Sequence, residues 1–230
     1  MKKILLSLLS IFIFAACGDI PVRPAEAFVN EVRAEVCPDR RVNIFDVEFE
    51  QKGKTVILRG EMNSERGMDS LVTRLEREGY TVANTIQLLP DHDALDRKVY
   101  GVINRAVVNI RVEPSSRSEM ATQAVLGHPL RVYKEEGGRY YVQTPDGYLG
   151  WLGGGAFAAM TEEEFNAWRN SETMIYLKDN GYIYQEASEN SDRIGDITAT
   201  SLVRIVGAEH GFVKVAYPDG RTGYIDRSYR

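Results

Sequence analysis

The chain has 230 residues, a formal net charge of −5 at pH 7 and only two cysteines. This length suits two or three small domains rather than one large core. The acidic balance argues against a nucleic-acid partner, because binding the phosphate backbone requires a basic surface. With only Cys17 and Cys37 available, and Cys17 assigned a different role below, we expect domains held together by burial rather than by disulfides.

The first residues have the pattern of an export signal. Two lysines precede an apolar run over residues 4–16, which is too short to span a bilayer comfortably. Small residues directly before Cys17 make this segment resemble a bacterial lipoprotein signal, in which the cysteine is acylated and becomes the new N-terminus. The resemblance implies a signal peptide over 1–16, a tether over 17–23 and a lipid anchor in the envelope of a Gram-negative bacterium, with the outer membrane favoured over the inner. The alternative is an ordinary cleaved signal with an incidental cysteine.

Residues 24–90 predict a small α+β module. Apolar residues at helical spacing over 25–37 are followed by two alternating segments around a turn at 51–54, by a second helical segment and by a closing strand. This order predicts two helices packed on one sheet, and it resembles the small BON-type modules of bacterial envelope proteins. Cys37 stands before Pro38 at the end of the first helix, and we expect it to be a small buried hydrophobe rather than a reactive thiol.

Asp91, His92 and Asp93 follow this module and combine residue types that bind metals. Three adjacent side chains cannot converge on one ion without distant partners, so a solvated linker is the favoured interpretation. We therefore predict no metal site and no cofactor.

The second half of the chain contains an internal duplication. "TPDGYLGWL" returns 73 residues later as "YPDGRTGYI", and the alignment continues without a gap in both directions. Each copy has short alternating segments separated by turn residues, a pattern typical of small closed β-barrels. The predicted fold is therefore multidomain and mainly β: the α+β module, an SH3-like barrel over 98–157, a linker helix over 158–171 and a second barrel over 172–230.

The segment "MTEEEFNAWRN" predicts the linker helix. Thr161 and Glu164 have the spacing of a capping box, and Phe165 and Trp168 fall on one face of the helix. We expect this aromatic pair to clamp the helix onto the neighbouring barrels. The glycines of 153–156 predict a flexible point before it.

Two stretches of the first copy, "VNIRVEPSSRS" and "GYLGWL", make it resemble the bacterial SH3-like (SH3b) barrel, with an Asn-x-Arg start and a Gly-Trp-apolar end. The second copy resembles it too, with Tyr184 in place of Arg111 and Tyr224 in place of Trp151. The order of elements is similar to the N-terminal, non-catalytic part of Bacteroides-type cysteine peptidases of the NlpC family: a lipoprotein signal, an α+β module, a barrel, the "EFNAWR" helix and a second barrel. Those γ-D-glutamyl-L-diamino acid endopeptidases cleave peptidoglycan stem peptides.

The catalytic part of that family has no counterpart in this sequence. The peptidase domain, with a nucleophilic cysteine and a histidine base, would follow the second barrel, whereas the sequence stops at Arg230. Cys17 and Cys37 both precede the barrels, and His128 and His210 lie in expected turns. Because a cysteine nucleophile needs a base within hydrogen-bonding reach, we expect this chain not to be an enzyme.

The resemblance also implies a ligand site on the first barrel. Glu113 and Tyr148 match the acidic residue and the tyrosine that, in the family, face the free amine of the L-Ala-D-Glu end, and Trp151 would add an aromatic wall. The alternative is that Glu113 supports a turn and Tyr148 packs on the barrel. In the second copy Arg221 replaces the tyrosine, and we expect its cation to compete for Glu186 and repel an ammonium. We therefore predict that the first barrel binds the stem peptide and that the second barrel has a structural role only.

Three functions remain open. The first is a lipid-anchored, non-catalytic protein that binds peptidoglycan stem peptides. The second is the targeting and pocket-forming part of an NlpC-family peptidase whose catalytic domain is truncated or on a separate chain. The third is an envelope scaffold that binds other proteins. The match of Glu113 and Tyr148 favours the first two.

Overall fold

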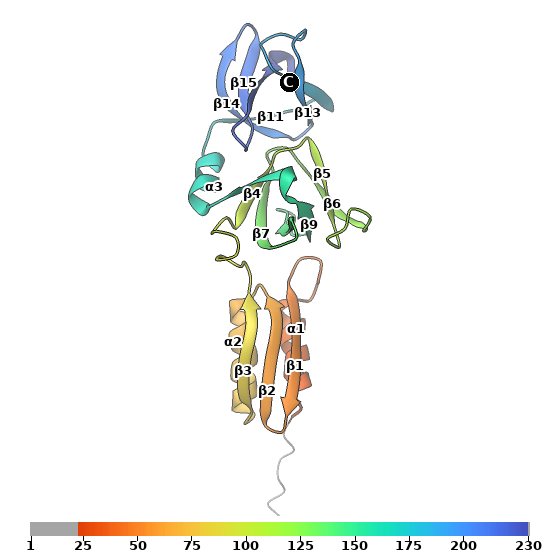
Figure 1. The fold of residues 1–230 in the computed structure, drawn as a ribbon, viewed down its shortest axis with the longest axis vertical. Helices are drawn as coiled ribbons and strands as arrows, with labels where there is room; N and C mark the ends of the chain where they lie inside the picture. The colour runs from red at the N-terminus through yellow and green to blue at the C-terminus, as the bar shows by residue number, and fades with distance from the viewer. Residues whose placement is uncertain (1–22, 230) are drawn as a thin grey trace, which may run out of the picture.

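The computed structural model describes residues 23–229 and shows three units in succession along the long axis of the molecule (Figure 1). These are the α+β module, a first barrel (barrel 1) and a second barrel (barrel 2). The predicted fold class, a small α+β module followed by two SH3-like barrels and a joining helix, is confirmed. Residues 1–16, Cys17 and most of the tether lie outside the described residues. Within the described part, no helix is long and apolar enough to cross a membrane.

The α+β module packs two helices on one face of a three-stranded sheet (Figure 1). Its elements are α1 (Ala25–Val36), β1 (Phe45–Lys52), β2 (Thr55–Met62), α2 (Glu65–Arg77) and β3 (Thr81–Leu88). β1 and β2 form an antiparallel hairpin, and β3 runs parallel to β2. Apolar residues of both helices are fully buried against β1 and β2, which matches their spacing in the sequence.

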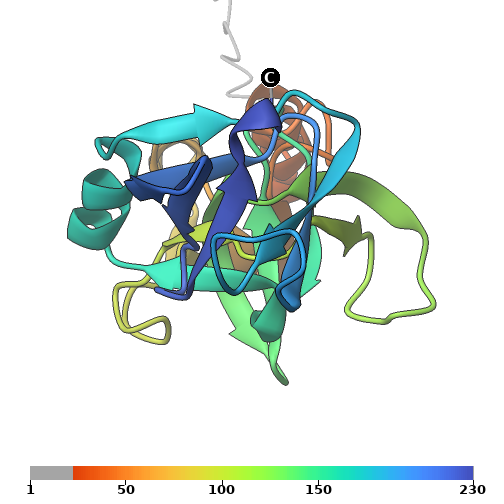
Figure 2. The same cartoon turned by 90° about the horizontal axis from the view of Figure 1, so that it is seen from above.

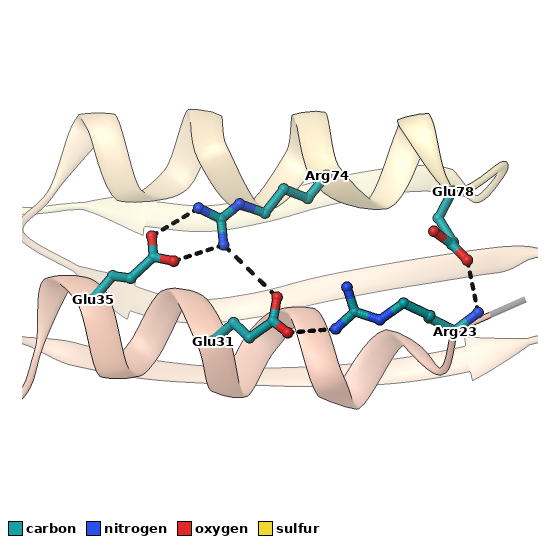
Figure 3. Close-up of polar contacts among 5 residues, drawn as sticks. All are labelled: Arg23, Glu31, Glu35, Arg74 and Glu78. Atoms are coloured by element: carbon teal, nitrogen blue, oxygen red, sulfur yellow. Dashed lines mark hydrogen bonds and ion pairs between the residues drawn. The ribbon is translucent and has the colours of Figure 1, made fainter.

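Charged side chains also connect the two helices of the module (Figure 3). The Arg74 guanidinium donates hydrogen bonds to both carboxylate oxygens of Glu35, each at 2.8 Å, and lies 3.8 Å from Glu31. Arg23 forms an ion pair with Glu31, and its backbone amide donates to Glu78 at 2.7 Å. The hydrogen bonds from Arg74 hold the pKa of Glu35 below its usual value. Exposed ion pairs contribute little to stability, so the apolar core supplies most of the packing energy.

The two barrels repeat one strand order. Barrel 1 contains a seven-stranded sheet made of β4 (Tyr100–Ile103), β5 (Val107–Arg111), β6 (Met120–Val125), β7 (Pro129–Glu136), β8 (Arg139–Gln143), β9 (Leu149–Gly153) and β10 (Phe157–Met160). Barrel 2 contains a six-stranded sheet made of β11 (Thr173–Ile175), β12 (Asn180–Tyr184), β13 (Arg193–Thr198), β14 (Leu202–Glu209), β15 (Phe212–Ala216) and β16 (Thr222–Asp226).

Each strand from β5 to β9 has a counterpart that begins and ends 73 residues later. The irregularities in strand pairing repeat as well. The register shifts after Ile110 in β5 and after Ile183 in β12, and again after Val132 in β7 and after Ile205 in β14. A β-bulge is set by its local backbone, so the duplication preserves the backbone in detail.

The boundary of barrel 1 differs from the sequence prediction. Residues 158–160, which were assigned to the linker, belong to β10 and pair with β4, so barrel 1 extends to Met160. The predicted flexible point at 153–156 is part of the barrel: Gly153 ends β9 and 154–156 form a short 3-10 helix. A Cβ on Gly154 would lie 2.8 Å from the Tyr140 ring, so this glycine serves close packing rather than flexibility.

The linker helix α3 (Glu162–Arg169) connects the barrels as predicted. Thr161 and Glu164 form the complete capping box. The Phe165 ring stacks on Tyr100 of barrel 1 with centroids 4.8 Å apart, and Trp168 is buried with the Arg204 guanidinium of barrel 2 over its ring. Seen along the long axis, α3 lies on the opposite side of the barrels from the long β5–β6 loop (Figure 2).

The barrels also contact each other directly through the turn after β6. Leu126 is fully buried in the hydrophobic core of barrel 2, and the Leu202 amide donates a hydrogen bond to its carbonyl at 2.8 Å. Gly127 has φ +82°, and a Cβ there would lie only 1.9 Å from the Leu202 carbonyl oxygen. This close approach requires glycine, and it places the two barrels in a defined orientation.

Candidate functional site

The α+β module docks on barrel 1 through the loop between α1 and β1. The Leu149 amide donates a hydrogen bond to the Arg41 carbonyl at 2.7 Å, and the Gln143 side chain donates to the Val42 carbonyl at 2.8 Å. A small buried apolar cluster completes the junction and consists of Ile44, Leu89, Tyr133 and Leu149. These hydrogen bonds to backbone carbonyls, together with the buried apolar cluster, fix the position of the loop against barrel 1.

A pocket of about 200 Å³ lies at this junction. Trp151 and Tyr141 form its aromatic side, with ring centroids 5.0 Å apart, and Trp151 is only 8% exposed. The residues that line it come from both units: Val112, Lys134, Tyr141 and Trp151 from barrel 1, and Arg40, Asn43, Ile44, Phe45, Asp46 and Glu61 from the module. Burial raises the pKa of Tyr141 above its ordinary value, so its phenol stays neutral and can donate a hydrogen bond.

One ion pair of the pocket crosses from barrel 1 to the module. The Lys134 ammonium lies 2.6 Å from Glu61 and 2.8 Å from Glu136, and 5.6 Å from the centre of the Trp151 ring. Burial by itself would lower the pKa of Lys134. The hydrogen bonds with Glu136 and Glu61 have the larger combined effect, so the pKa of Lys134 is raised above its ordinary value. The Lys134 cation is therefore neutralised by protein carboxylates.

The three ligand residues predicted from the sequence take different positions. Trp151 lines the pocket, whereas neither Glu113 nor Tyr148 does. Glu113 is exposed on the β5–β6 loop directly after Val112, and its backbone amide donates a hydrogen bond to the Ser118 hydroxyl oxygen at 2.9 Å. Its carboxylate has no hydrogen-bond or ion-pair partner within residues 23–229. The Glu113 carboxylate is thus not occupied by a partner in the described part of the protein.

Tyr148 is half-buried where the module meets barrel 1. The Arg41 guanidinium carbon lies 6.0 Å from the centre of its ring, and Arg41 itself pairs with Asp39 at 2.7 Å. A cation therefore stands beside this tyrosine in barrel 1, which the sequence did not indicate. The contact between Arg41 and Tyr148 arises only when the module docks, so no local pattern could have revealed it.

The expectation that Arg221 would compete for Glu186 in barrel 2 is wrong. The Arg221 guanidinium pairs with Asp219 at 2.8 Å, lies over the Tyr217 ring, and contacts the Asn104 carbonyl of barrel 1 at 3.4 Å. Arg221 contributes to the contact between the barrels because the Asp-Gly turn directs it there.

Barrel 2 has a counterpart of the Trp151 pocket on the equivalent face. Gln185 and Tyr224, which correspond to Val112 and Trp151, line a space of about 300 Å³. Its other lining residues come from the β12–β13 loop and from the end of β14 with the turn after it: Glu186, Ala187, Ser188, Glu209 and His210. Tyr224 is partly exposed and donates a hydrogen bond to Glu209 at 3.2 Å. No second α+β module within the described residues covers this face.

Cys37 is buried, as expected from the sequence. Its thiol donates a hydrogen bond to the Asn43 carbonyl at 3.3 Å, and burial raises its pKa. A buried thiol with a raised pKa is a poor nucleophile. Within the described residues, no histidine is hydrogen-bonded to it, and no group of three or more His, Cys, Asp or Glu side chains could hold a metal ion.

Both barrels match known protein families. Residues 110–156 match the bacterial dipeptidyl-peptidase SH3 domain, and residues 179–229 match the bacterial SH3 domain. The chain carries two bacterial SH3 domains. This result confirms the family resemblance of both copies, and it fits a protein associated with peptidoglycan.

Among solved structures, the chain is similar to an NlpC/P60 family protein from Bacillus cereus ATCC 10987, with 16% identity, a TM-score of 0.47, and coverage of 56% of this chain and 55% of that one. It is also similar to NlpC2 of Trichomonas vaginalis, with 16% identity, a TM-score of 0.24 and coverage of 57% and 46%. The chain thus spans about half the length of these structures. A search of curated proteins finds no match.

Proposed function

We propose that the protein is a lipid-anchored, non-catalytic envelope protein that binds the free L-Ala-γ-D-Glu end of peptidoglycan stem peptides. Its two bacterial SH3 domains support an association with the wall. The observation that carries the proposal is the pocket beside Trp151, which combines aromatic rings with charges of both signs. A stem-peptide end with a free amine carries an ammonium and a carboxylate close together, so its charges match those of the pocket.

The size of the pocket also favours a peptide end. Pockets for drug-sized ligands occupy about 300–1,000 Å³, and this one is about 200 Å³. It suits the terminal part of a peptide, while the rest of the ligand remains outside. Trp151 and Tyr141 would exclude water from one side of the guest.

Glu113 and Tyr148 would assist from barrel 1. Glu113 is exposed and directly follows the pocket-lining Val112, so its carboxylate would meet an ammonium at the rim without displacing a protein partner. Because Glu113 is exposed, we expect a contribution of about 1 kcal/mol, as for other solvent-exposed charge pairs. Tyr148 lies outside the pocket lining, so its hydroxyl group would contribute a hydrogen bond only to the part of the ligand that remains outside the pocket.

The position of the described N-terminus supports a lipid anchor at Cys17. The Tyr80 hydroxyl donates a hydrogen bond to the Arg23 carbonyl at 2.7 Å, and α1 begins at the end of the module opposite barrel 1 (Figure 1). A tether leaving from this end would let both barrels project from the membrane toward the wall. Multiple acylation at Cys17 would hold the protein firmly, and Cys17→Ala should release it from the membrane fraction. Retention of this variant would contradict the anchor.

A second candidate function is favoured by the match of residues 110–156 to the bacterial dipeptidyl-peptidase SH3 domain. In that case the barrels would form the targeting and pocket-forming part of a cysteine peptidase whose catalytic domain lies elsewhere. The two candidates differ in affinity: a wall-binding protein binds stem peptide by itself, whereas a pocket-forming part needs the catalytic domain to complete the site.

The test is calorimetric titration of the tripeptide L-Ala-γ-D-Glu-L-Lys into unlipidated residues 17–230. We expect measurable binding, at least fivefold weaker binding of the N-acetylated tripeptide, and recovery of the peptide uncut after long incubation. Acetylation removes the ammonium and leaves size and shape nearly unchanged. Equal affinity for the free and acetylated peptides would contradict the proposed function, and cleavage abolished by Cys37→Ser would contradict its non-catalytic character.

A further inference from the structure

Two charged groups of the pocket have no ion-pair partner in the protein. Arg40 and Asp46 both line it from the α+β module, and neither forms an ion pair within residues 23–229. The other cation and carboxylate that cross the junction, Lys134 and Glu61, are bonded to each other. The pocket therefore offers one free positive and one free negative charge, and both come from the module.

We propose that the α+β module is part of the ligand site, with Asp46 receiving the ammonium of the guest and Arg40 receiving its carboxylate. The inference rests on the proposed function, and it assigns charge recognition to a unit outside the SH3 domains. Barrel 1 would then supply the aromatic surface of Trp151 and Tyr141, while the module supplies the charges. Arginine suits the second role because its planar guanidinium can hold a carboxylate through two parallel hydrogen bonds.

The neighbourhood of each group supports this assignment. Asp46 in β1 pairs across the hairpin with Glu61 in β2, so their side chains leave the same face of the sheet. Lys134 neutralises Glu61, which leaves Asp46 as the carboxylate available to a cation. Arg40 lies in the loop whose neighbouring carbonyls, on Arg41 and Val42, bond to barrel 1, so its backbone is held beside the pocket before any ligand arrives.

This arrangement requires a particular combination of charges in the ligand. A ligand must carry both an ammonium and a carboxylate, because a guest with one charge would leave the other protein charge without its partner. A stem-peptide end with a free D-Glu α-carboxylate carries both charges. The same end with that carboxylate amidated keeps only the ammonium. Amidation would therefore weaken binding through Arg40, and acetylation would weaken it through Asp46.

The experiment pairs each protein charge with the ligand charge that it should hold. The free tripeptide, its N-acetylated form and its D-Glu α-amide form are titrated into wild type, Arg40→Gln and Asp46→Asn. For wild type, we expect about five- to tenfold weaker binding of each modified peptide. Arg40→Gln should bind the acid and the α-amide equally. Asp46→Asn should lose most of the discrimination between the free and acetylated peptides, with the remainder due to Glu113, and the double variant Asp46→Asn/Glu113→Gln should bind both equally.

Two matched variants control for general charge effects. Glu48→Gln changes the next outward-facing carboxylate of β1, and Arg66→Gln changes an exposed arginine of α2; neither residue lines the pocket. Both variants should keep the discrimination of wild type, and thermal unfolding verifies that all variants are folded. If wild type discriminates against the acetylated peptide but Asp46→Asn and Arg40→Gln preserve every ratio, the inference is wrong and the proposed function stands. If wild type does not distinguish the free from the acetylated peptide, both are wrong.

Discussion

The same face of the same fold has two different environments in this protein. In barrel 1, Trp151 is 8% exposed beneath the α+β module, beside the Lys134–Glu61 ion pair. In barrel 2, its counterpart Tyr224 is partly exposed and faces a pocket lined only by residues of barrel 2. Strand bounds and bulges repeat at an offset of 73 residues. Duplication thus preserved the backbone, while the neighbouring unit determined the surface chemistry.

The largest expected difference between the barrels concerns these two aromatic residues. Trp151→Ala removes a buried indole that packs beside Tyr141 and lines the pocket at the junction with the module, and we expect it to lower the free energy of unfolding by about 3–5 kcal/mol. Tyr224→Ala removes a partly exposed ring and should cost about 1–2 kcal/mol. Urea unfolding followed by circular dichroism measures both. Equal losses would show that docking of the module does not bury Trp151 as the structure indicates.

The turns after β6 and β13 provide the next comparison. Gly127 and Thr200 occupy equivalent positions, with φ +82° and +68°. Gly127→Thr would drive a Cβ into the Leu202 carbonyl and should cost about 3 kcal/mol. Thr200→Gly meets no such obstacle and should change stability by about 1 kcal/mol or less. Thermal unfolding of the two variants tests this asymmetry, and equal destabilisation would contradict the close contact between the barrels.

The ion pair between barrel 1 and the module predicts a pH dependence that barrel 2 lacks, since Gly207 replaces Lys134 there. The folded state raises the pKa of Lys134. This contribution to stability is therefore fully present below the unfolded pKa of about 10.4 and is lost as pH rises through the folded value. We expect Lys134→Met to lose about 1–2 kcal/mol at pH 7.

The measurement is the difference in unfolding free energy between wild type and Lys134→Met across pH 7–11.5. The difference should stay constant up to the ordinary lysine pKa and shrink above it. A difference that grows with rising pH would have the wrong sign and would contradict the assigned direction of the pKa.

The smallest expected effect concerns the two rim carboxylates. Glu113→Gln should weaken tripeptide binding about fivefold, equivalent to about 1 kcal/mol, because the side chain is exposed. Glu186→Gln should leave affinity unchanged, because barrel 2 has no docked module to complete the pocket. Parallel calorimetric titrations decide the comparison. A larger loss of tripeptide affinity for Glu186→Gln than for Glu113→Gln would indicate that the ligand site lies on barrel 2.

Much of the fold could be predicted because its signals are local. Alternating apolar residues, Asp-Gly turns and the Thr161–Glu164 cap depend on neighbours within a few residues, and the duplication repeats them. The C-terminal boundary of barrel 1 was harder to predict from the sequence. β10 pairs with β4, more than fifty residues earlier in the chain, so the sequence around Phe157 resembles a linker until that pairing is known.

By itself, the sequence determined the order of the three units, the barrel type and the candidate aromatic residue Trp151. Only the tertiary structure decided which face of barrel 1 is covered and which charges reach it. Arg40 and Asp46 are exposed polar residues with no periodic or motif signal, and they meet Trp151 across about a hundred residues of chain. The physical reason is that docking depends on complementary surfaces of two finished folds, and surface charges do not leave a local pattern in the sequence.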